Sequence, residues 1–515
     1  MHSLVRTLRA ADEALTGTFD HAFPPAANPW RHLGALAFLC LAVAVASGIV
    51  AFALYDTSVR GAYESGRRLQ QDPLLLGRLL RGLHRYSADG FMVLTVLHLA
   101  REAARGHFAG VRWFSWLTGI PLAWLLWVAG ITGLWLLWDE RALYSITATA
   151  EWLQALPLAG EVFARNFLTP DAMNDRFFSL VLFVHIGVPL LLLGTVWVHG
   201  QRVSQVRIWP PRALVAGSLL MLGLLALGVP AQSLGPADTG HVAAGMPLDW
   251  FYQFAHPLAD AVSATGAWLL AAVLTVLLAV MPLLPLRPRS AQPARVDPGN
   301  CNGCARCAAD CPFGAVVMIP RNDGRTPLRL ASVTPDLCAA CGICVGACPS
   351  STPFRSLQDL VSGIELPGMP VAALRAQLRS KLSALAGERK VLLFTCRQAS
   401  AFESLADAST AVMPMECAAM VPPSFIEYAL RLGAGGVLIA GCREGDCEFR
   451  LGDRWVRERM SGAREPRLRA AAPRERIAVL WPGSCAARLR QAVSALRERL
   501  TSPHSPNEAG HAQHP

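Results

Sequence analysis

The sequence predicts a multidomain protein in which an all-α bundle of six transmembrane helices is followed by an α+β domain and then by a small α/β domain. Long apolar segments all end before about residue 286, two regular cysteine clusters follow residue 300, and strand-like runs alternate with helical stretches from residue 389. Hydrophobic residues make up 53% of the 515 residues and charged residues 16%, which lies outside the usual range of soluble proteins.

The six apolar segments are each long enough to cross a hydrocarbon core of about 30 Å. They cover residues 33–54, 86–104, 113–138, 177–199, 213–232 and 262–285. The apolar spacing of residues 139–176 predicts surface helices rather than a further crossing. Residues 1–30 are polar and the first apolar run has no signal-peptide cleavage site at its end, so we expect the protein to insert through its own first helix.

The distribution of arginines predicts the orientation in the membrane. Arginines precede the first crossing, join the second to the third, and follow the fourth and the sixth, whereas the loop before the sixth carries Asp238, Asp249 and Asp260 without Lys or Arg. The positive-inside rule then predicts a multi-pass protein of the cytoplasmic (inner) membrane whose termini and later domains face the cytoplasm. The segment between the first two crossings runs against this rule, because it carries Arg60, Arg67, Arg68, Arg78 and Arg81. The net charge of +10 reflects these flanks, and we predict no nucleic-acid binding.

The predicted domain boundaries follow changes in composition. They are a membrane domain over 1–286, a Pro-rich linker over 287–298, a cysteine-motif domain over 299–357, a helical connector over 358–388, an α/β domain over 389–500 and a disordered tail over 501–515.

Four histidines in or beside the second and fourth crossings form two pairs, His84 with His98 and His185 with His199. The members of each pair are 14 residues apart, almost four helical turns, so they share a helix face at a separation of about 21 Å. The first and third crossings repeat this spacing with glycines, which allow a flat macrocycle to approach the backbone: Gly34, Gly48, Gly119 and Gly133. The pattern predicts two stacked haems, whereas a single histidine could equally be a hydrogen-bonded packing residue.

Over roughly residues 28–285 the chain resembles cytochrome b of the quinol-oxidising bc complexes. Further matching features are Trp30 before Gly34, Arg81 before His84, Arg101 after His98, and Arg176-Phe177-Phe178 ahead of His185 and Pro189. The resemblance implies that His84 and His185 hold an outer haem b, that His98 and His199 hold an inner one, and that Arg81 and Arg101 pair with haem propionates. Two imidazoles per iron leave no open coordination position, so these haems are expected to carry electrons. Cys40 is expected to be a packing residue.

The segment from Pro247 to Tyr252 resembles the Pro-Glu-Trp-Tyr motif that the cytochrome b family places at its outer quinol site. Asp249 replaces the glutamate and Leu248 is an extra residue, with Trp250 and Tyr252 following. The resemblance implies that Asp249, Trp250 and Tyr252 form a catalytic quinone site in which the carboxylate accepts a proton. The alternative is an aromatic anchor at the membrane interface beside a solvated aspartate.

The most specific signal is a C-x2-C-x2-C-x3-C-P pattern that occurs twice. In this pattern the fourth cysteine binds the cluster of the other motif, so we predict two [4Fe-4S] clusters. One is held by Cys301, Cys304, Cys307 and Cys348, the other by Cys338, Cys341, Cys344 and Cys311. The domain resembles two-cluster ferredoxins, and the paired Cys-Pro repeats argue against the alternative, zinc.

Four cysteines of the last domain are predicted to converge, because most of them follow strand-like runs and sites in α/β sheets gather at the carboxyl ends of strands. They are Cys396, Cys417, Cys442 and Cys447. Residues 389–465 resemble the delta subunit of methyl-viologen-reducing hydrogenase, which implies one [2Fe-2S] cluster and electron transfer to a flavoprotein. Cys485 has no matching role and is expected to be structural.

Together these features predict a quinone-linked oxidoreductase, as a subunit of a membrane complex, that exchanges electrons between the quinone pool and a cytoplasmic partner. No nucleotide-binding or flavin motif is apparent, so the partner is expected to be ferredoxin, a flavoprotein or a 2-oxoacid:ferredoxin oxidoreductase. Electron flow outward to quinone is favoured by the membrane potential, which suggests energy coupling. The alternatives are a non-catalytic anchor and redox relay, or a bc-like quinol oxidase subunit. The cytochrome b resemblance implies a homodimer or a larger complex.

Overall fold

The computed structural model describes residues 2–156, 173–240, 245–284, 292–326, 328–355, 360–387, 389–399, 402–483 and 485–500. The chain divides into two compact units, Met1–Arg202 with Val206–Arg287 and Val203–Gln205 with Pro288–Pro515. The predicted disordered tail 501–515 lies outside the described residues, as do residues 157–172 of the predicted surface-helix stretch and residues 287–291 of the predicted linker.

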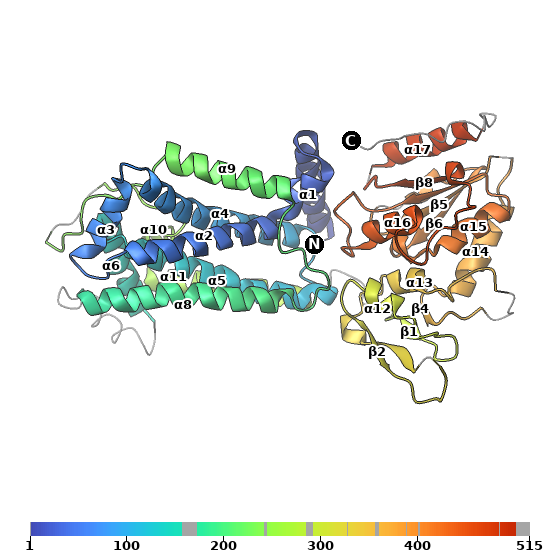
Figure 1. Ribbon diagram of the computed structural model, residues 1–515, viewed down its shortest axis with the longest axis horizontal. Helices are drawn as coiled ribbons and strands as arrows, with labels where there is room; N and C mark the ends of the chain where they lie inside the picture. Colours follow the sequence, from blue (N-terminus) through green and yellow to red (C-terminus); the bar gives the residue numbers. More distant parts are fainter. Residues whose placement is uncertain are drawn as a thin grey trace. The chain divides into compact units, whose positions relative to one another are not determined.

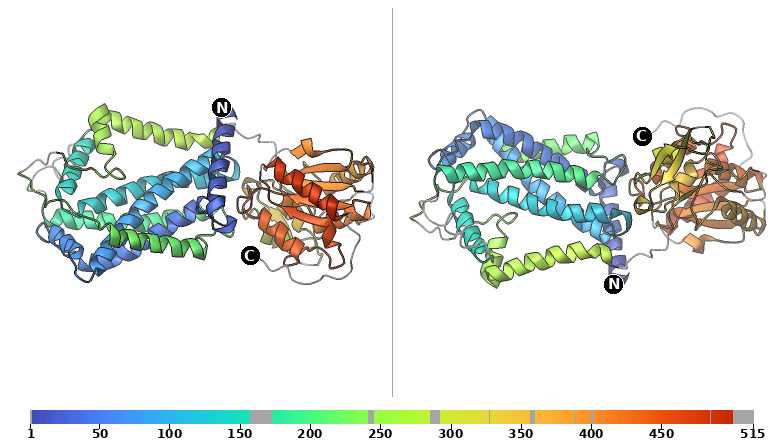
Figure 2. Two further views of the ribbon diagram at one scale, coloured as in Figure 1. Left: turned by 90° about the horizontal axis from the view of Figure 1, so that it is seen from above. Right: turned by 90° about the horizontal axis from the view of Figure 1, so that it is seen from below.

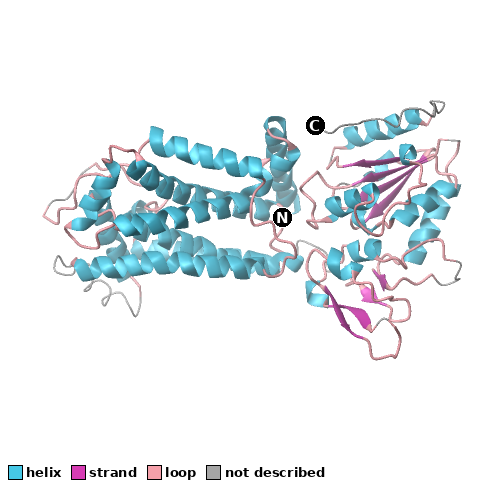
Figure 3. Cartoon of the chain, viewed as in Figure 1, coloured by secondary structure: helices cyan, strands magenta, loops and turns pink. Residues whose placement is uncertain are grey.

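The described part of the first unit is helical, and the named strands all belong to the second unit (Figure 3). Its α-helices are α1 (His2–Ala22), α2 (Leu33–Leu54), α3 (Gly61–Gln70), α4 (Leu76–Ala104), α5 (Trp113–Trp135), α6 (Glu140–Gln154), α8 (Asp175–Gly200), α9 (Arg212–Gly228), α10 (Ala255–Val262) and α11 (Ala264–Val280). Short 3-10 helices cover Pro25–Ala27, Pro29–His32, Gly110–Arg112 and Met281–Leu283.

Four helical spans among the described residues are long and apolar enough to cross a membrane: Pro29–Leu54, Gly110–Trp135, Asp175–Gly200 and Ala264–Leu283. They correspond to the first, third, fourth and sixth predicted crossings. The fifth corresponds to α9, an apolar helix of only 17 residues. The second lies within α4, which is 29 residues long and carries arginines and Asp89. The count of six crossings is therefore not established by length and composition, which support four.

The core of the first unit lies between α2, α4, α5 and α8, which run side by side in Figure 1. Buried side chains from all four helices meet there: Ala37, Cys40, Leu41, Phe91, Leu126, Ala129, Val188 and Leu192. Cys40 is 6% exposed within this cluster, in agreement with its predicted packing role. In a membrane such packing, rather than removal from water, holds helices together.

At the starts of α6 and α8, side chains satisfy free backbone N–H groups. Asn174 accepts hydrogen bonds from the N–H groups of Arg176 and Phe177 at the start of α8, and Asp139 accepts one from Ala142 at the start of α6. Helix α1 crosses the end of the bundle (Figure 2) and contacts α4 and the 3-10 helix Pro29–His32. Helix α1 therefore lies across the end of the bundle, and the chain enters the bundle with α2.

The second unit begins with two short antiparallel strand pairs. Strand β1 (Arg295–Val296) pairs with β4 (Ile364–Glu365), and β2 (Val316–Pro320) pairs with β3 (Arg329–Val333). The five-residue helices α12 (Arg306–Asp310) and α13 (Ile343–Ala347) occupy matching positions in the two cysteine repeats. Each follows a residue with positive φ, Ala305 at 61° and Gly342 at 73°. The described fold thus repeats where the sequence motif repeats.

The rest of the second unit contains α14 (Val371–Ser383) and a four-stranded parallel sheet in the order β6-β5-β7-β8. The strands are β5 (Val391–Cys396), β6 (Thr410–Met415), β7 (Gly436–Ala440) and β8 (Ile477–Leu480), with helices α15 (Pro423–Arg431), α16 (Gly452–Ser461) and α17 (Ala486–Arg499). Single 3-10 turns cover Pro335–Leu337, Phe402–Leu405, Ala418–Met420 (η8) and Arg474–Arg476. Every residue of β5 and β7 is buried, which explains their uninterrupted apolar sequences.

Candidate redox sites

Two of the four predicted haem-binding histidines face each other inside the bundle. The rings of His84 on α4 and His185 on α8 have their centroids 6.2 Å apart. Metal–imidazole bonds are about 2 Å long in zinc sites. Two bonds of that length, together with half of each ring, account for roughly 6 Å. The gap between the rings therefore fits one metal atom bound by both histidines.

The hydrogen bonds of the ring nitrogens leave the opposite nitrogen free for a metal. His84 Nδ1 lies 2.9 Å from the carbonyl oxygen of Ala44, and His185 Nδ1 lies 3.0 Å from that of Ala129. A carbonyl can only accept a hydrogen bond, so Nδ1 carries the proton in both rings and Nε2 keeps its lone pair. Such second partners fix the orientation of metal-binding imidazoles.

Each of the four predicted glycines lies against one of the four histidines. A Cβ atom at Gly48 would lie 3.0 Å from Cε1 of His84, and one at Gly133 would lie 2.7 Å from Cε1 of His185. The corresponding distances are 3.3 Å from Gly34 to Cε1 of His98 and 3.5 Å from Gly119 to Cε1 of His199. The bundle therefore brings the predicted glycines and histidines together at two levels.

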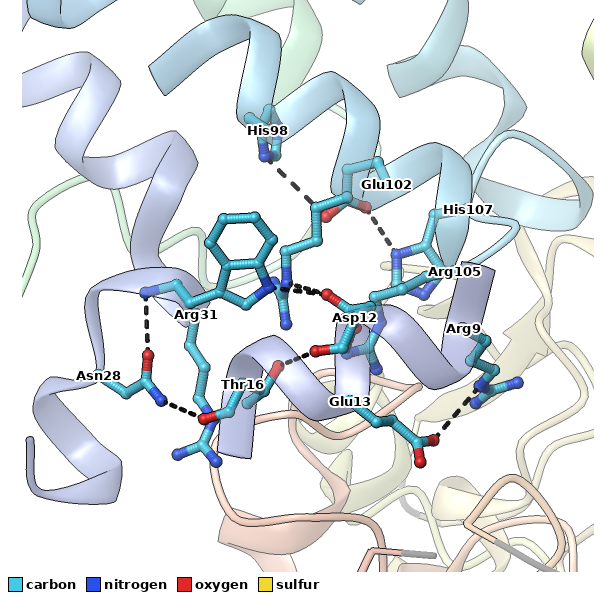
Figure 4. A network of polar contacts seen from close by, with 12 residues as sticks. Arg9, Asp12, Glu13, Thr16, Asn28, Arg31, His98, Glu102, Arg105 and His107 are labelled. Atoms are coloured by element: carbon cyan, nitrogen blue, oxygen red, sulfur yellow. Dashed lines mark hydrogen bonds and ion pairs between the residues drawn. The ribbon is translucent and has the colours of Figure 1, made fainter. Parts of the chain in front are cut away.

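The end of the bundle nearest His98 holds a network of charged side chains (Figure 4). Asp12 of α1 is 4% exposed and accepts hydrogen bonds from Arg101 Nε (3.1 Å), Arg105 Nη1 (3.4 Å) and the indole nitrogen of Trp30 (2.8 Å). Arg101 was predicted to pair with a haem propionate, and the structure gives it a protein carboxylate as a partner. The sequence reasoning missed Asp12, which lies among polar residues before the first apolar run.

Glu102 lies between His98 and a second histidine in the same network. Its carboxylate accepts a hydrogen bond from His107 Nδ1 at 2.6 Å and lies 4.0 Å from His98 Nδ1. Arg112 lies 3.6 Å from the same carboxylate. His98 therefore faces a carboxylate, whereas the Nδ1 atom of His199 lies 3.1 Å from the Thr118 hydroxyl.

Arg81, the other residue predicted to pair with a propionate, donates to three neutral oxygen atoms. Its partners are the carbonyl of Gly66 (3.1 Å), the side chain of Gln70 (2.9 Å) and the hydroxyl of Ser233 (2.7 Å). These contacts join α3 and the segment after α9 to α4. A charged group on a cofactor would have to share this guanidinium with them.

The predicted quinone residues lie in a buried charged cluster. Asp249 is 5% exposed, pairs with Arg85 of α4 and accepts hydrogen bonds from the N–H groups of Phe251 and Tyr252. The alternative expectation of a solvated aspartate is therefore wrong, because Arg85 stabilises this carboxylate inside the protein. Arg85 also pairs with Asp89 at 3.0 Å, so one guanidinium bridges two carboxylates.

The aromatic residues of this segment have different environments. Trp250 is 73% exposed, whereas Tyr252 is 2% exposed and packs its ring against Gly130 of α5. The Tyr252 hydroxyl and Oδ1 of Asp89 are buried atoms without a hydrogen-bond partner among the described residues. Buried polar atoms are nearly always satisfied, so these two atoms could bind a polar ligand.

The cysteine repeats bring their sulfur atoms together across the two motifs. A pocket is lined by Cys301, Cys304 and Cys307 of the first motif and by Cys348, the fourth cysteine of the second. These four residues are named the first cysteine set. The second cysteine set comprises Cys311, Cys338, Cys341 and Cys344.

Burial raises the pKa of several of these thiols. Burial, and then the neighbouring Cys348, raises the pKa of Cys307 to about 12, and burial raises the pKa of Cys341 and Cys344 as well. A buried thiolate needs a positive partner, and iron ions would supply that charge. None of the fourteen cysteines forms a disulfide.

The four predicted cysteines of the last domain converge at the carboxyl ends of adjacent strands. Cys396 ends β5, Cys417 follows β6, Cys442 follows β7, and the sulfur atoms of Cys396 and Cys442 lie 3.8 Å apart. Hydrogen bonds from Cys417 and Cys442 hold the pKa of Cys396 well below its ordinary value. Cys396, Cys417, Cys442 and Cys447 are named the C-terminal cysteine set.

Gly452, the first residue of α16, lies directly against this set. A Cβ atom there would lie 2.6 Å from Sγ of Cys417 and 3.0 Å from Sγ of Cys447. Within the described residues, no three His, Cys, Asp or Glu side chains converge on a single metal-ion position. Cys485 lies outside them, at the start of α17.

The fold and these sites together define a class of protein. A chain that joins a helical membrane domain with paired histidines to cysteine-rich domains is an electron-transfer protein. Residues 18–205 match the family described as cytochrome b/b6/petB. Residues 291–352 match the 4Fe-4S dicluster domain, and residues 394–502 match the methyl-viologen-reducing hydrogenase, delta subunit.

Individual relatives establish the family of the first domain. Cytochrome b6 of Prochlorothrix hollandica is 30% identical over 165 residues, which is 31% of this chain and 74% of that protein. Cytochrome b6 of Euglena gracilis is 31% identical over 172 residues, which is 33% of this chain and 78% of that protein. The chain belongs to the cytochrome b/b6 family, and the two iron–sulfur domains follow in the predicted order.

More distant similarities are partial. Cytochrome b of Akanthomyces muscarius is 27% identical over 202 residues, so the match spans 38% of this chain and only half of that relative. A solved structure described as "Hyperthermophilic respiratory Complex III" aligns with a TM-score of 0.40 and 19% identity over 49% of this chain and 74% of that chain. Membership of the cytochrome b/b6 family implies haem b, and the dicluster domain implies iron–sulfur clusters.

Proposed function

We propose that this protein is a quinone-linked oxidoreductase, acting as a subunit of a membrane complex, that transfers electrons between the quinone pool and a low-potential partner in the cytoplasm. The observation that carries the proposal is the pair of facing imidazoles, His84 and His185 at 6.2 Å, in a chain that also carries three cysteine sets. Haems and iron–sulfur clusters each supply one-electron transfer.

Each redox group has its own set of protein ligands in this proposal. His84 and His185 hold the outer haem b, and His98 and His199 hold the inner one. Four glycines leave room for the macrocycles: Gly34, Gly48, Gly119 and Gly133. The first and second cysteine sets each hold one [4Fe-4S] cluster, and the C-terminal cysteine set holds a [2Fe-2S] cluster. Arg81 and Arg101 stabilise negative charge at the two ends of the bundle.

The proposed outer quinone site consists of Asp249, Trp250 and Tyr252 with Arg85 and Asp89 beside them. The unpartnered Tyr252 hydroxyl and Asp89 Oδ1 support it, because a quinone headgroup offers both a carbonyl acceptor and, when reduced, a hydroxyl donor. For Asp249 to accept a proton, its contact with Arg85 must loosen, and Asp89 can hold the guanidinium meanwhile.

The membrane arrangement belongs to the same proposal. We place six crossings in the cytoplasmic membrane, with α4 and α9 completing the four apolar spans, and we place the iron–sulfur domains in the cytoplasm. A partner such as ferredoxin or a soluble flavoprotein would exchange electrons with them. Outward electron flow releases about 2.3 kcal/mol per charge for each 100 mV of membrane potential.

The test is optical haem reduction in the purified protein under anaerobic conditions. Reduced ferredoxin should reduce the haems, and quinone should then reoxidise them in a reaction that a quinone-site inhibitor blocks. Asp249→Asn should slow the quinone step, whereas Asp238→Asn, in the exposed part of the same loop, should not. If neither quinone nor quinol changes the redox state of the haems, the quinone-linked function is refuted. The protein would then be a membrane anchor and redox relay.

A further inference from the structure

The two [4Fe-4S]-type cysteine sets differ in their surroundings within the second unit. The residues next to the second set contact the sheet domain that carries the C-terminal set. The pocket of the first set is lined only by residues between Cys301 and Ile364, and Cys304 in it is exposed.

A buried arginine joins the second set to the C-terminal set. Arg459 of α16 donates to the Asp310 carboxylate at 2.5 Å and to the carbonyl oxygens of Ala419 at 2.8 Å and Ile343 at 3.4 Å. Asp310 directly precedes Cys311, Ile343 directly precedes Cys344, and Ala419 lies two residues after Cys417. One guanidinium therefore holds three backbone segments that each present a cysteine.

Both oxygen atoms of the Asp310 carboxylate have an arginine partner. The side chains of Asp310 and Arg459 are 2% and 1% exposed, and Arg464 donates to the second oxygen of Asp310 at 2.6 Å. The Trp455 indole nitrogen donates to the backbone carbonyl of Asp310 at 3.0 Å. Charge-assisted hydrogen bonds of this kind impose a specific geometry, and breaking one in the interior is costly.

Glycines bring the two backbones into contact at the same place. Gly342 follows Cys341 and has a φ of +73°; a Cβ atom there would lie 2.5 Å from Sδ of Met420 in η8. A Cβ atom at Gly346 would lie 2.1 Å from the carbonyl oxygen of Ala419.

We propose that electrons pass between the C-terminal cysteine set and the second cysteine set, across the contact of Gly342 with Met420, and that the first cysteine set lies beyond the second. Each transfer moves one electron, so that iron in one set is oxidised and iron in the other is reduced, and no bond or proton changes place. Arg459 and Asp310 act as positioning residues that fix the separation. This inference rests on the cluster content of the proposed function but not on quinone.

The test is electron paramagnetic resonance of the fully reduced full-length protein, with iron content measured in parallel. In the wild type, the signal of the C-terminal cluster should be broadened, and its relaxation accelerated, by the neighbouring spin. Cys341→Ser should abolish this effect, and the matched variant Cys304→Ser should leave it in place. Loss of the coupling in Cys304→Ser but not in Cys341→Ser would overturn the proposed order.

Two further measurements keep the test decisive. Cys304 is exposed, so the Cys304→Ser variant is expected to fold even if Cys341→Ser does not. Spin coupling that persists in Cys304→Ser is then sufficient support for the proposed order of electron transfer. Asp310→Asn should reduce the relaxation enhancement at unchanged iron content, which a merely structural role would not do; an unaltered enhancement would show that the ion pair does not set the separation. Spin coupling without quinone-dependent haem reoxidation would refute the quinone function while leaving this inference intact.

Discussion

Glu102 distinguishes the inner histidine pair from the outer one. The Nδ1 atoms of His84 and His185 lie against backbone carbonyls, whereas His98 Nδ1 lies 4.0 Å from the Glu102 carboxylate. A carboxylate near a metal-binding imidazole makes the ligand more basic and stabilises the higher charge of ferric iron. His107 and Arg112 share the negative charge and moderate this effect.

We expect Glu102→Gln to raise the midpoint potential of the inner haem and to leave that of the outer haem unchanged. A loss of about 1 kcal/mol in stabilisation of the ferric state corresponds to roughly 40 mV for one electron. A redox titration of the two haems measures the shift, with Thr118→Val, beside His199, as a control that removes only a neutral partner. An unchanged inner potential would contradict the assigned role of Glu102.

Arg85 holds together the buried charged cluster around Asp249. It pairs with both Asp89 and Asp249, so its loss leaves two buried carboxylates of like charge. We expect Arg85→Gln to destabilise the protein by about 3–5 kcal/mol and Asp249→Asn by less, because Asp89 still pairs with the arginine. Thermal unfolding of detergent-solubilised protein, followed through haem absorbance, measures both, and the double variant Arg85→Gln/Asp89→Asn should recover part of the loss.

At the scale of elements, a glycine of α5 allows the His185 ring of α8 to lie against the α5 backbone. A Cβ atom at Gly133 would lie 2.7 Å from the His185 ring, whereas one at Gly187 of α8 has nothing within 4 Å. We therefore expect Gly133→Ala to displace the ring and reduce the content of the outer haem by about half or more, and Gly187→Ala to retain full haem content. The haem-to-protein ratio is the measurement; equal ratios would show that the ring can move at no cost.

A glycine at the start of α16 likewise lies directly against the C-terminal cysteine set. Gly452→Ala would push against the sulfur atoms of Cys417 and Cys447, so we expect a loss of the cluster signal without loss of the sheet domain. Gly368→Ala, at a position with open space, is the matched control in the same unit. Iron content and circular dichroism together distinguish a damaged cluster site from an unfolded domain.

At the scale of the whole molecule, the chain separates a membrane unit from an iron–sulfur unit. Oxidative removal of the iron–sulfur clusters should abolish haem reduction by reduced ferredoxin while preserving reduction by quinol, because the proposed haem ligands all belong to the first unit. Anaerobic stopped-flow absorbance measures both reactions, with mock-treated protein as the reference. Continued reduction by ferredoxin after cluster removal would show that ferredoxin reacts with the haems directly.

The sequence by itself predicted the histidine pairs, their facing glycines and the cysteine motifs. These features depend on local periodicity: residues 14 apart share a face of a helix, and a repeated cysteine spacing defines a ligand set wherever it folds. The same reasoning located β5, which ends at Cys396, and β7, which precedes Cys442, because an uninterrupted apolar run marks a buried parallel strand.

Only the tertiary structure decided which charges meet. Asp12 binds Arg101 across 89 residues, Arg85 binds Asp249 across 164, and Arg459 binds Asp310 across 149. An ion pair of this kind has no period and no local signature, since its partners are chosen by the packing of distant elements in an interior where an unpaired charge is costly. For that reason the proposed redox ligands could be predicted from the sequence, while the charged residues that lie around them became apparent only in the fold.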